Sequence, residues 1–171
     1  SQSRGKLKFD SERNVFIPGT SVQAERSAGA CKGSETLAEA FADGSAAGAD
    51  AATKAGFSAS SRSVTVAGVH DARGGFLGVV PHPHDAGRVK AFVDFQNDVT
   101  AKDIKLATRE GMRSIEHVKR YTTTGMATDQ GKLSNMNALA IASQALDKSI
   151  PEVGLTTFRQ PYTPISFGAM A

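Results

Sequence analysis

The sequence offers very little sulfur for cross-linking, because Cys31 is its single cysteine. One thiol cannot build an internal disulfide framework, so we expect a fold without cross-links, in a reducing compartment. The sequence also has little excess of one charge sign. The formal net charge is only +3, and no run of Lys and Arg is present that would predict a nucleic-acid partner.

Long apolar runs are absent as well. No stretch has the length of a transmembrane helix, and residues 1–10 lack the apolar centre of a signal peptide. We therefore expect no membrane partner and a cytoplasmic location. The 171 residues suffice for one ordinary domain or two small ones. The first residue is Ser1 rather than methionine, which suggests an internal fragment of a longer chain.

The third absence is the G-x-G-x-x-G phosphate loop, so no complete dinucleotide-binding fingerprint is present. Instead, a glycine-rich turn at residues 27–34 precedes an Ala-rich helix, predicted from about Thr36 to Lys54. Free N–H groups at such a helix start suit an anion, although a helix cap with tight packing explains the pattern at least as well. One face of this helix is predicted to be apolar: Leu37, Ala40, Phe41, Ala47 and Ala51.

Short strands are predicted on both sides of this helix. Residues 6–9 and 15–17 predict a hairpin around a polar turn at residues 10–14. After a Ser/Ala linker at residues 58–62, Val64–Val66 and Phe76–Val80 predict a second strand pair around the turn His70–Gly75.

The sequence Pro-His-Pro-His-Asp at residues 81–85 is the strongest candidate for a metal site. His82 and His84 are two residues apart, and Asp85 adds a carboxylate beside them. However, prolines favour an extended connector, and a site would need a further ligand from elsewhere. We predict a plain linker and no metal site, and the role of His82 and His84 stays open.

Residues 90–146 predict a small helical unit. After a strand at residues 90–94, Thr100 is the expected N-cap of a first helix that Gly111 ends. Ser114 opens a second helix, which runs to about Tyr121. A Thr/Gly-rich loop follows, and Ser134 is predicted to cap a last helix over residues 135–146, with a core stripe made of Met136, Leu139, Ala140, Ser143 and Leu146. Beyond it, Ile150 begins a predicted extended tail with three prolines.

No nucleophile, base and orienting group are placed together in this sequence. Cys31 has no evident histidine partner, and His117 is expected on an exposed helix face. A helix cap and a solvated strand end explain the acidic residues Asp94, Asp98 and Asp103. We therefore predict no catalytic residue in this chain.

The Thr/Gly-rich loop, defined here as residues 122–135, is the better candidate for function. Its hydroxyls, its flexible glycines and the cation of Lys132 suit a phosphate, with backbone N–H groups as a nest and the start of the last helix adding donors. A turn-rich connector, whose hydroxyls bond their neighbours, explains the loop equally well.

The arrangement of short helices resembles the small helical domain of bacterioferritin-associated ferredoxins. That family has a C-x-C pair before its first helix and two further cysteines in the loop before its last. Aligned with this pattern, the chain has Asp94 and Gln96 at the first pair, and Asp129 and Ser134 at the second. An iron–sulfur cluster needs thiolates, so the resemblance implies the scaffold without its cluster.

A second resemblance covers nearly the whole chain. The runs FVDFQNDVTAKDI, HVKRYTTTGMATDQGK, SNMNALAIA and IPEVGLTTFRQPYTP are similar to the alpha subunit of heterotetrameric sarcosine oxidase. This implies an α+β fold: the C-terminal part of a dinucleotide-binding domain (1–58), a strand pair and linker (59–89), the ferredoxin-like helical domain (90–148), and a tail (149–171) leading to an absent folate-binding domain.

The same resemblance implies a function for the parent complex: oxidative demethylation of sarcosine to glycine, a one-carbon unit and hydrogen peroxide. FMN would be shared with a beta subunit, whereas NAD and folate would be bound by the full-length subunit rather than by this fragment. A non-catalytic assembly module and a subunit of a related amine or opine dehydrogenase are the alternatives. The expected FMN contacts are Thr123, Thr124, Gly125, Gln130, Gly131, Lys132 and Asn135.

Overall fold

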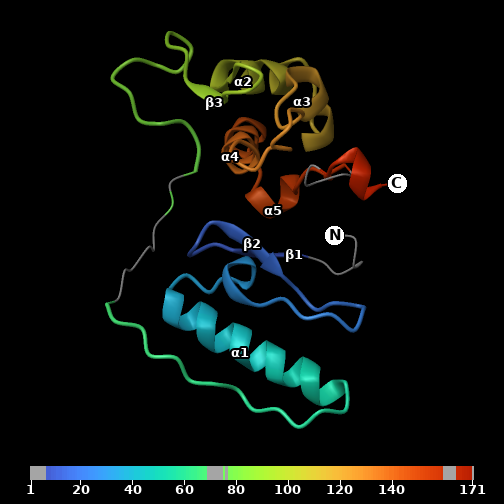
Figure 1. The fold of residues 1–171 in the computed structure, drawn as a ribbon. Helices are drawn as coiled ribbons and strands as arrows, with labels where there is room; N and C mark the ends of the chain where they lie inside the picture. Colours follow the sequence, from blue (N-terminus) through green and yellow to red (C-terminus); the bar gives the residue numbers. More distant parts are fainter. Residues whose placement is uncertain (1–6, 69–74, 76, 160–164, 171) are drawn as a thin grey trace. The chain divides into compact units, whose positions relative to one another are not determined.

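The computed structural model of the chain describes residues 7–68, 75, 77–159 and 165–170 (Figure 1). The chain divides into two compact units, Ser1–Phe76 and Leu77–Ala171, called here the N-terminal unit and the C-terminal unit. Both combine short strands with helices, which agrees with the predicted α+β class. No helix in the described ranges is long and apolar enough to cross a membrane.

The N-terminal unit begins with the predicted hairpin. Strands β1 (Leu7–Asp10) and β2 (Val15–Pro18) pair antiparallel, with Asp10 opposite Val15. A carboxylate oxygen of Asp10 accepts the N–H groups of Glu12 at 3.0 Å and Arg13 at 3.1 Å, which closes the turn between the strands. Such an Asx turn supplies the local reason for the hairpin.

Helix α1 (Leu37–Lys54) follows a short 3-10 turn, η1 (Gly29–Lys32), and confirms the predicted Ala-rich helix. A capping box begins it, because the Thr36 hydroxyl accepts the N–H of Glu39 while the Glu39 carboxylate accepts the N–H of Thr36. Its predicted apolar face is not buried in this unit. Leu37 is 60% exposed and Phe41 is 44% exposed.

The second predicted strand pair is wrong within the described residues. Neither Val64–Val66 nor residues 77–80 form a strand, while Phe76 and most of the turn at residues 70–75 lie outside the described part of the chain. Two short strands are stable only when an apolar face is covered. Val64 is 49% exposed, so its alternating pattern has no surface to pack on in this unit.

The C-terminal unit opens with a second small hairpin, β3 (Phe92–Asp94) and β4 (Val99–Thr100), paired antiparallel. It leads directly into helix α2 (Ala101–Arg109), which begins at the predicted cap. The Thr100 hydroxyl accepts the N–H of Asp103, and the Asp103 carboxylate accepts the N–H of Thr100. Gly111, with φ +97°, ends the helix region as predicted.

Helix α3 (Ile115–Thr122) and helix α4 (Asn135–Leu146) complete the unit, and α4 is its centre. Helices α2, α3 and α5 all contact α4. Six consecutive residues of α4, from Ala138 to Ser143, are buried, so this helix is covered on every side rather than along the predicted stripe. Ile104, Val118, Leu139 and Ile141 are the largest fully buried apolar side chains of the unit.

The start of the predicted extended tail is helical. Ile150–Val153 forms a single turn, α5, which a capping box between Ser149 and Glu152 begins. Pro151 fits there because the first turn of a helix has no use for its missing N–H group. A second short turn, η2, covers Phe167–Ala169, whereas the predicted extension at residues 161–164 lies outside the described residues.

Candidate functional site

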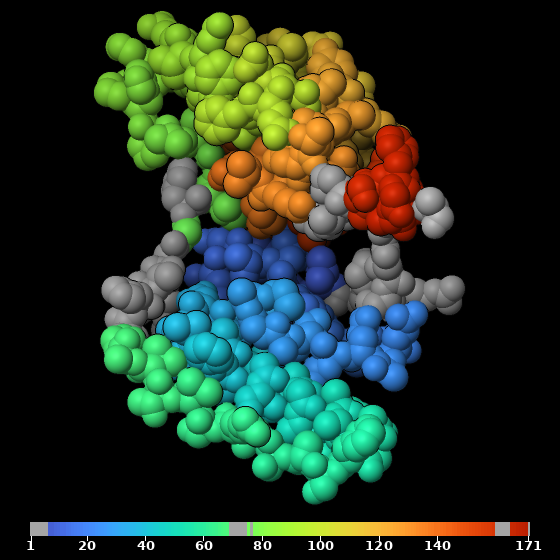
Figure 2. Space-filling view, viewed as in Figure 1, coloured from blue at the N-terminus to red at the C-terminus, as the bar shows by residue number. Residues whose placement is uncertain are grey.

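The Thr/Gly-rich loop connects α3 to α4 and reaches the surface of the C-terminal unit, where Figure 2 shows the stretch around residue 130 in orange. Several of its residues have left-handed backbone, which only a tightly specified loop retains. Thr123 has φ +65° and Gln130 has φ +53°, beside Gly125 at φ +70° and Gly131 at φ +75°. Internal hydrogen bonds explain how these conformations are held.

Asp94 is the residue that fixes this loop to the hairpin. One of its carboxylate oxygens accepts the N–H groups of Gln96 at 2.9 Å and Asn97 at 3.1 Å, and the other accepts the N–H of Gly125 at 2.8 Å. The prediction of a solvated strand end is wrong for Asp94, which is 2% exposed. The loop folds over the carboxylate, and the three N–H groups replace the water that a buried anion loses.

Gln96, Asp129 and Ser134 occupy the other positions that align with the ferredoxin cysteines. The Gln96 side-chain oxygen accepts the Thr128 hydroxyl at 3.3 Å and the Asp129 N–H at 3.4 Å, so the hairpin and the loop meet here too. Ser134 was predicted to cap the last helix, but its side chain makes no cap hydrogen bond. Its hydroxyl is buried without a hydrogen-bond partner among the described residues. Polar side chains therefore tie the loop at three of the four aligned positions.

Asn135 is wedged between the two glycines of the loop. A Cβ atom at either Gly125 or Gly131 would overlap the Asn135 side chain, so both glycines are required by close approach as well as by backbone angle. The amide nitrogen of Asn135 donates to the Gln130 carbonyl at 3.4 Å and to the Thr156 hydroxyl at 3.3 Å. The loop is thus packed around one side chain.

The predicted phosphate nest is occupied from within. The N–H of Gly125 donates to Asp94, that of Gly131 donates to the Asp129 carboxylate at 3.1 Å, and that of Lys132 donates to the Asp129 carbonyl at 3.2 Å. A bound phosphate would therefore meet side chains rather than a backbone cradle. Thr123 and Lys132 are exposed and could supply them, while Thr124 is buried and its hydroxyl bonds that of Thr122.

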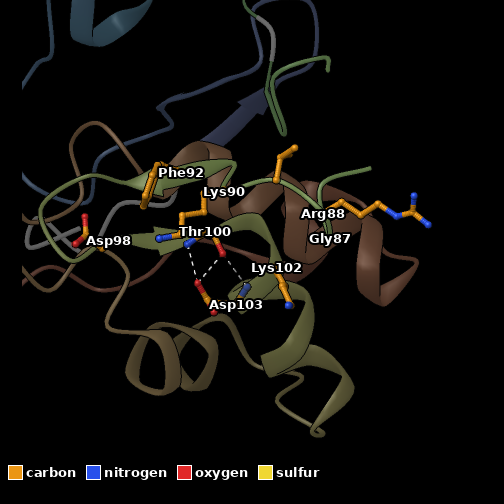
Figure 3. A pocket seen from close by; sticks show the side chains of 9 residues that line it. Gly87, Arg88, Lys90, Phe92, Asp98, Thr100, Lys102 and Asp103 are labelled. Carbon is orange, nitrogen blue, oxygen red and sulfur yellow. Dashed lines mark hydrogen bonds between the residues drawn. The ribbon is translucent and has the colours of Figure 1, made fainter. Parts of the chain in front are cut away.

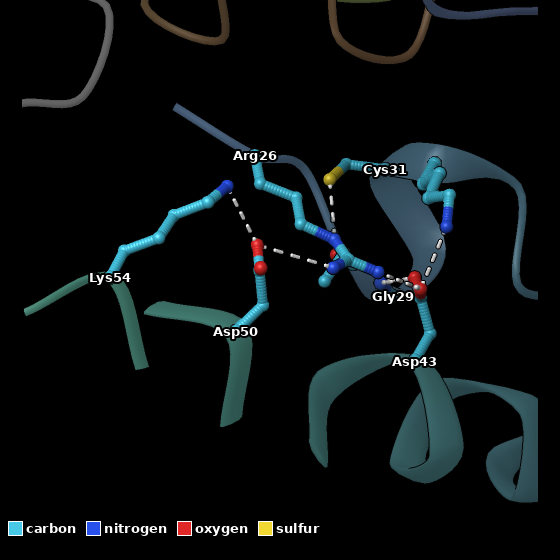
Figure 4. A network of polar contacts seen from close by, with 8 residues as sticks. Arg26, Gly29, Cys31, Asp43, Asp50 and Lys54 are labelled. Atoms are coloured by element: carbon cyan, nitrogen blue, oxygen red, sulfur yellow. Dashed lines mark hydrogen bonds and ion pairs between the residues drawn. The ribbon is translucent and has the colours of Figure 1, made fainter. Parts of the chain in front are cut away.

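The glycine-rich turn before α1 is occupied in the same way (Figure 4). The Gly29 N–H donates to the Asp43 carboxylate at 2.8 Å, and the Lys32 ammonium bonds the same group at 2.7 Å. The Lys32 hydrogen bond, with the Gly29 N–H next, lowers the pKa of Asp43 below its usual range. The Gly29 N–H, one of the donors that could have suited an external anion, is thus bonded to the chain's own carboxylate.

The histidines show no catalytic arrangement in the described part of the chain. The His82 Nδ1 atom accepts the backbone N–H of His84 at 3.0 Å, and both side chains are exposed. Within the described ranges, no group of three or more His, Cys, Asp and Glu side chains could hold a metal ion. His117 is exposed on α3, and the Cys31 thiol donates to the Ala28 carbonyl at 3.2 Å.

The comparisons with known proteins agree with the resemblance found in the sequence. A family model described as "Sarcosine oxidase A3 domain" matches residues 88–171. Residues 88–171 are therefore similar to this domain. Over 175 residues, including the whole of this chain, it is 38% identical to the sarcosine oxidase alpha subunit of Corynebacterium sp. strain P-1. The resemblance to sarcosine oxidase alpha subunits is confirmed.

Two further relatives come from Rhizobium meliloti strain 1021. Its sarcosine oxidase alpha subunit is 65% identical over 81 residues, 47% of this chain, and its opine oxidase subunit is 34% identical over 74 residues, 43% of this chain. The chain spans 18% of the Corynebacterium protein and 8% and 16% of these two. The part of each relative that matches this chain is thus a small share of that relative's length.

The fold is also similar to that of a solved structure, L-proline dehydrogenase from P. horikoshii. The TM-score is 0.72 at 20% identity, over 99% of this chain and 36% of the dehydrogenase chain. At this identity the likeness concerns the fold alone. It shows that both units, α+β in character, have counterparts within one longer polypeptide.

Two hollows near the start of residues 88–171 were missed by the sequence reasoning. One, of about 480 Å³, is lined by Gly87, Arg88, Val89, Lys90, Phe92, Asp98, Thr100, Lys102 and Asp103 (Figure 3). The other, of about 350 Å³, is mostly apolar, and the two share Val89, Lys90 and Phe92. In the sequence, only the cations Arg88, Lys90 and Lys102 could have indicated the first hollow, and they do not form a continuous run.

Proposed function

We propose that this chain is a segment of a sarcosine oxidase alpha-type subunit, and that its C-terminal unit forms one wall of an FMN site at the interface with a beta subunit. The match of residues 88–171 to the A3 domain, together with 38% identity over the whole chain, supports the proposal most directly. The complex would be cytoplasmic. NAD and folate would be bound by other parts of the full-length subunit.

The proposed reaction is the oxidative demethylation of sarcosine. Sarcosine, oxygen and water give glycine, formaldehyde and hydrogen peroxide, so that oxygen takes the two electrons lost by the N-methyl carbon, together with two protons. Flavins supply the hydride and electron transfer in such chemistry. For this chain we propose a binding role in the complex rather than a catalytic one. No iron–sulfur cluster is proposed, because the aligned ligand positions hold Asp94, Gln96, Asp129 and Ser134.

The exposed side of the Thr/Gly-rich loop suits a wall between subunits. Met126 is 49% exposed and Leu133 is 79% exposed, and the two precede and follow the loop's cation Lys132 in the sequence. Apolar side chains beside one cation match a flavin ring that carries a phosphate, and they also match the apolar centre of a subunit contact. The buried residues Thr124, Gly125 and Gly131, with the half-buried Asn135, would hold this surface in shape rather than bind the phosphate by their backbone.

A charge reversal in the assembled complex tests the proposal. Lys132→Glu places a carboxylate beside the flavin phosphate, so we expect the purified complex to lose about tenfold or more in affinity for FMN, with a matching fall in flavin content and peroxide production. Flavin content is measured by absorbance after denaturation. Lys132→Arg, which keeps the cation, should retain FMN, and Lys148→Glu, an exposed charge reversal after α4, is the control for net charge. Unchanged flavin content in Lys132→Glu would reject Lys132 as a contact.

An assembly module without cofactor contact is the second candidate function. The observation in its favour is that the loop's backbone donors at Gly125, Gly131 and Lys132 are already bonded within the chain. In that case Met126→Asp and Leu133→Asp would abolish co-purification with the beta subunit, while Lys132→Glu would leave the flavin content unchanged. The similarity to an opine oxidase subunit favours a module shared by oxidases with different substrates.

A further inference from the structure

We propose that the cavity of about 480 Å³ lined by residues between 87 and 103 binds a mononucleotide, that is, a molecule with a phosphate monoester at one end and a flat aromatic ring at the other. None of its lining residues belongs to the Thr/Gly-rich loop. The inference is therefore independent of the proposed flavin contact and can fail or succeed without it.

The cations of this cavity could neutralise the charge of a bound phosphate. Lys90 and Lys102 are exposed, flank Thr100 in Figure 3, and have no carboxylate partner among the described residues. Arg88 also lines the cavity, but its side chain extends away from the two lysines in this view. Lysines that are not paired with a carboxylate are free to neutralise a bound anion, and Lys is a frequent phosphate partner acting as a point charge.

The carboxylates of the cavity decide how strong an anion site can be. Asp103 is engaged in the helix cap, where one of its oxygens accepts the Thr100 N–H at 2.8 Å and the Thr100 hydroxyl at 2.6 Å. Asp98 is exposed, makes no hydrogen bond through its side chain among the described residues, and would repel an anion. The Asp98 carboxylate therefore weakens anion binding, and removing its charge should raise the affinity of the cavity for an anion.

The ring of Phe92 could stack on the flat ring of the ligand. It is 39% exposed, lines the same cavity as the lysines, and is also a wall of the apolar hollow of about 350 Å³. The ring of Phe95, 74% exposed, is tilted against it with centroids 6.2 Å apart. An exposed aromatic beside cations fits a ligand with a flat ring and an anionic group, because stacking and charge act on different ends of the same molecule.

Binding of three probes to the full chain tests the site, with inorganic phosphate, AMP and adenosine followed by amide NMR titration. We expect AMP to bind about tenfold more tightly than phosphate or adenosine, with shifts concentrated at residues 87–103 and an affinity that falls as salt rises. Lys90→Ala and Lys102→Ala should each weaken AMP binding about three- to tenfold and leave adenosine unaffected. Phe92→Leu should reduce AMP to the affinity of phosphate.

Two matched variants separate this site from general surface charge. Lys105→Ala removes an exposed cation of the same helix that does not line the cavity, and it should leave AMP binding unchanged. Asp98→Asn should strengthen AMP binding about two- to threefold, and its positive φ of +52° suits asparagine. Equal losses in Lys102→Ala and Lys105→Ala, weaker binding by Asp98→Asn, or shifts centred on residues 122–135 would overturn the proposal.

Discussion

The two units of this chain are stabilised by different kinds of contact. Every buried apolar side chain of the described residues lies in the C-terminal unit, between Val93 and Ala142, and none lies in the N-terminal unit. The N-terminal unit instead carries a cluster of close ion pairs, such as Lys32 with Asp43 at 2.7 Å and Lys54 with Asp50 at 2.9 Å. Exposed ion pairs contribute little, so only the C-terminal unit has a core of its own in the described ranges.

The distribution of buried apolar side chains indicates which of the two units can be stable by itself. Burial of apolar surface is the main favourable term in folding, and the N-terminal unit leaves Leu37 and Phe41 of α1 exposed. The solved dehydrogenase with a similar fold is a longer chain, of which this one covers 36%. Substitutions at equivalent positions in the two units therefore test whether their stabilities differ in this way.

Truncation of one apolar residue in each unit should show the largest difference. Ile141→Ala empties a fully buried site in α4 and should lower the stability of the C-terminal unit by about 3–4 kcal/mol. Leu37→Ala removes a side chain that is 60% exposed and should cost less than about 1 kcal/mol. Native-state hydrogen exchange of the α4 and α1 amides measures both. A similar cost at the two positions would show that the N-terminal unit has a hidden core.

Two glycines with the same backbone angle allow a second comparison. Gly131 and Gly29 have φ +75° and φ +77°, but a Cβ at Gly131 overlaps Asn135 whereas one at Gly29 meets nothing within 4 Å. We expect Gly131→Ala to cost about 2–3 kcal/mol and Gly29→Ala about 1 kcal/mol, the cost of the left-handed angle alone. Thermal unfolding and amide exchange are the measurements. Equal costs would mean that Asn135 moves aside freely.

The smallest effect concerns acid. The Lys32 hydrogen bond and the Gly29 N–H hold the pKa of Asp43 below its usual range, so its ionised form is favoured in the folded state. This contribution is present above the unfolded pKa of about 3.9 and is lost as the pH falls through the lower folded value. Asp43→Asn should therefore flatten the acid-side loss of Gly29 amide protection. Glu12→Gln, at an exposed carboxylate of the same unit, should leave the profile unchanged.

The local elements were predictable because their signals are local. The Thr100 and Asp103 spacing specifies a capping box within four residues, and the helix that follows begins where the sequence indicates. The Thr36 and Glu39 pair does the same for α1. The failure at Val64–Val66 has the same origin, since alternation alone does not show whether a strand finds a neighbour.

The interior of the candidate site was not predictable in this way. Nothing in the local pattern indicates that Asp94 reaches Gly125, which lies 31 residues further on, or that the loop's N–H groups are bonded internally. The hollow lined by Lys90 and Lys102 is equally hidden, because it forms only when β4 and α2 come together with the preceding segment. Contacts between distant residues depend on the assembled fold, whereas caps and turns depend on their own few residues.

The Asn135 wedge makes three positions depend on one another. Any side chain added at Gly125 or Gly131 overlaps Asn135, so a mutational scan that varies either glycine alone should recover almost no functional variants. A smaller residue at position 135 would open space but would also give up the bond to Thr156, and with it one tie to the segment after α5. Tolerated changes at these sites should therefore arise in pairs. In aligned relatives, such pairs would appear as covariation between positions 125, 131 and 135.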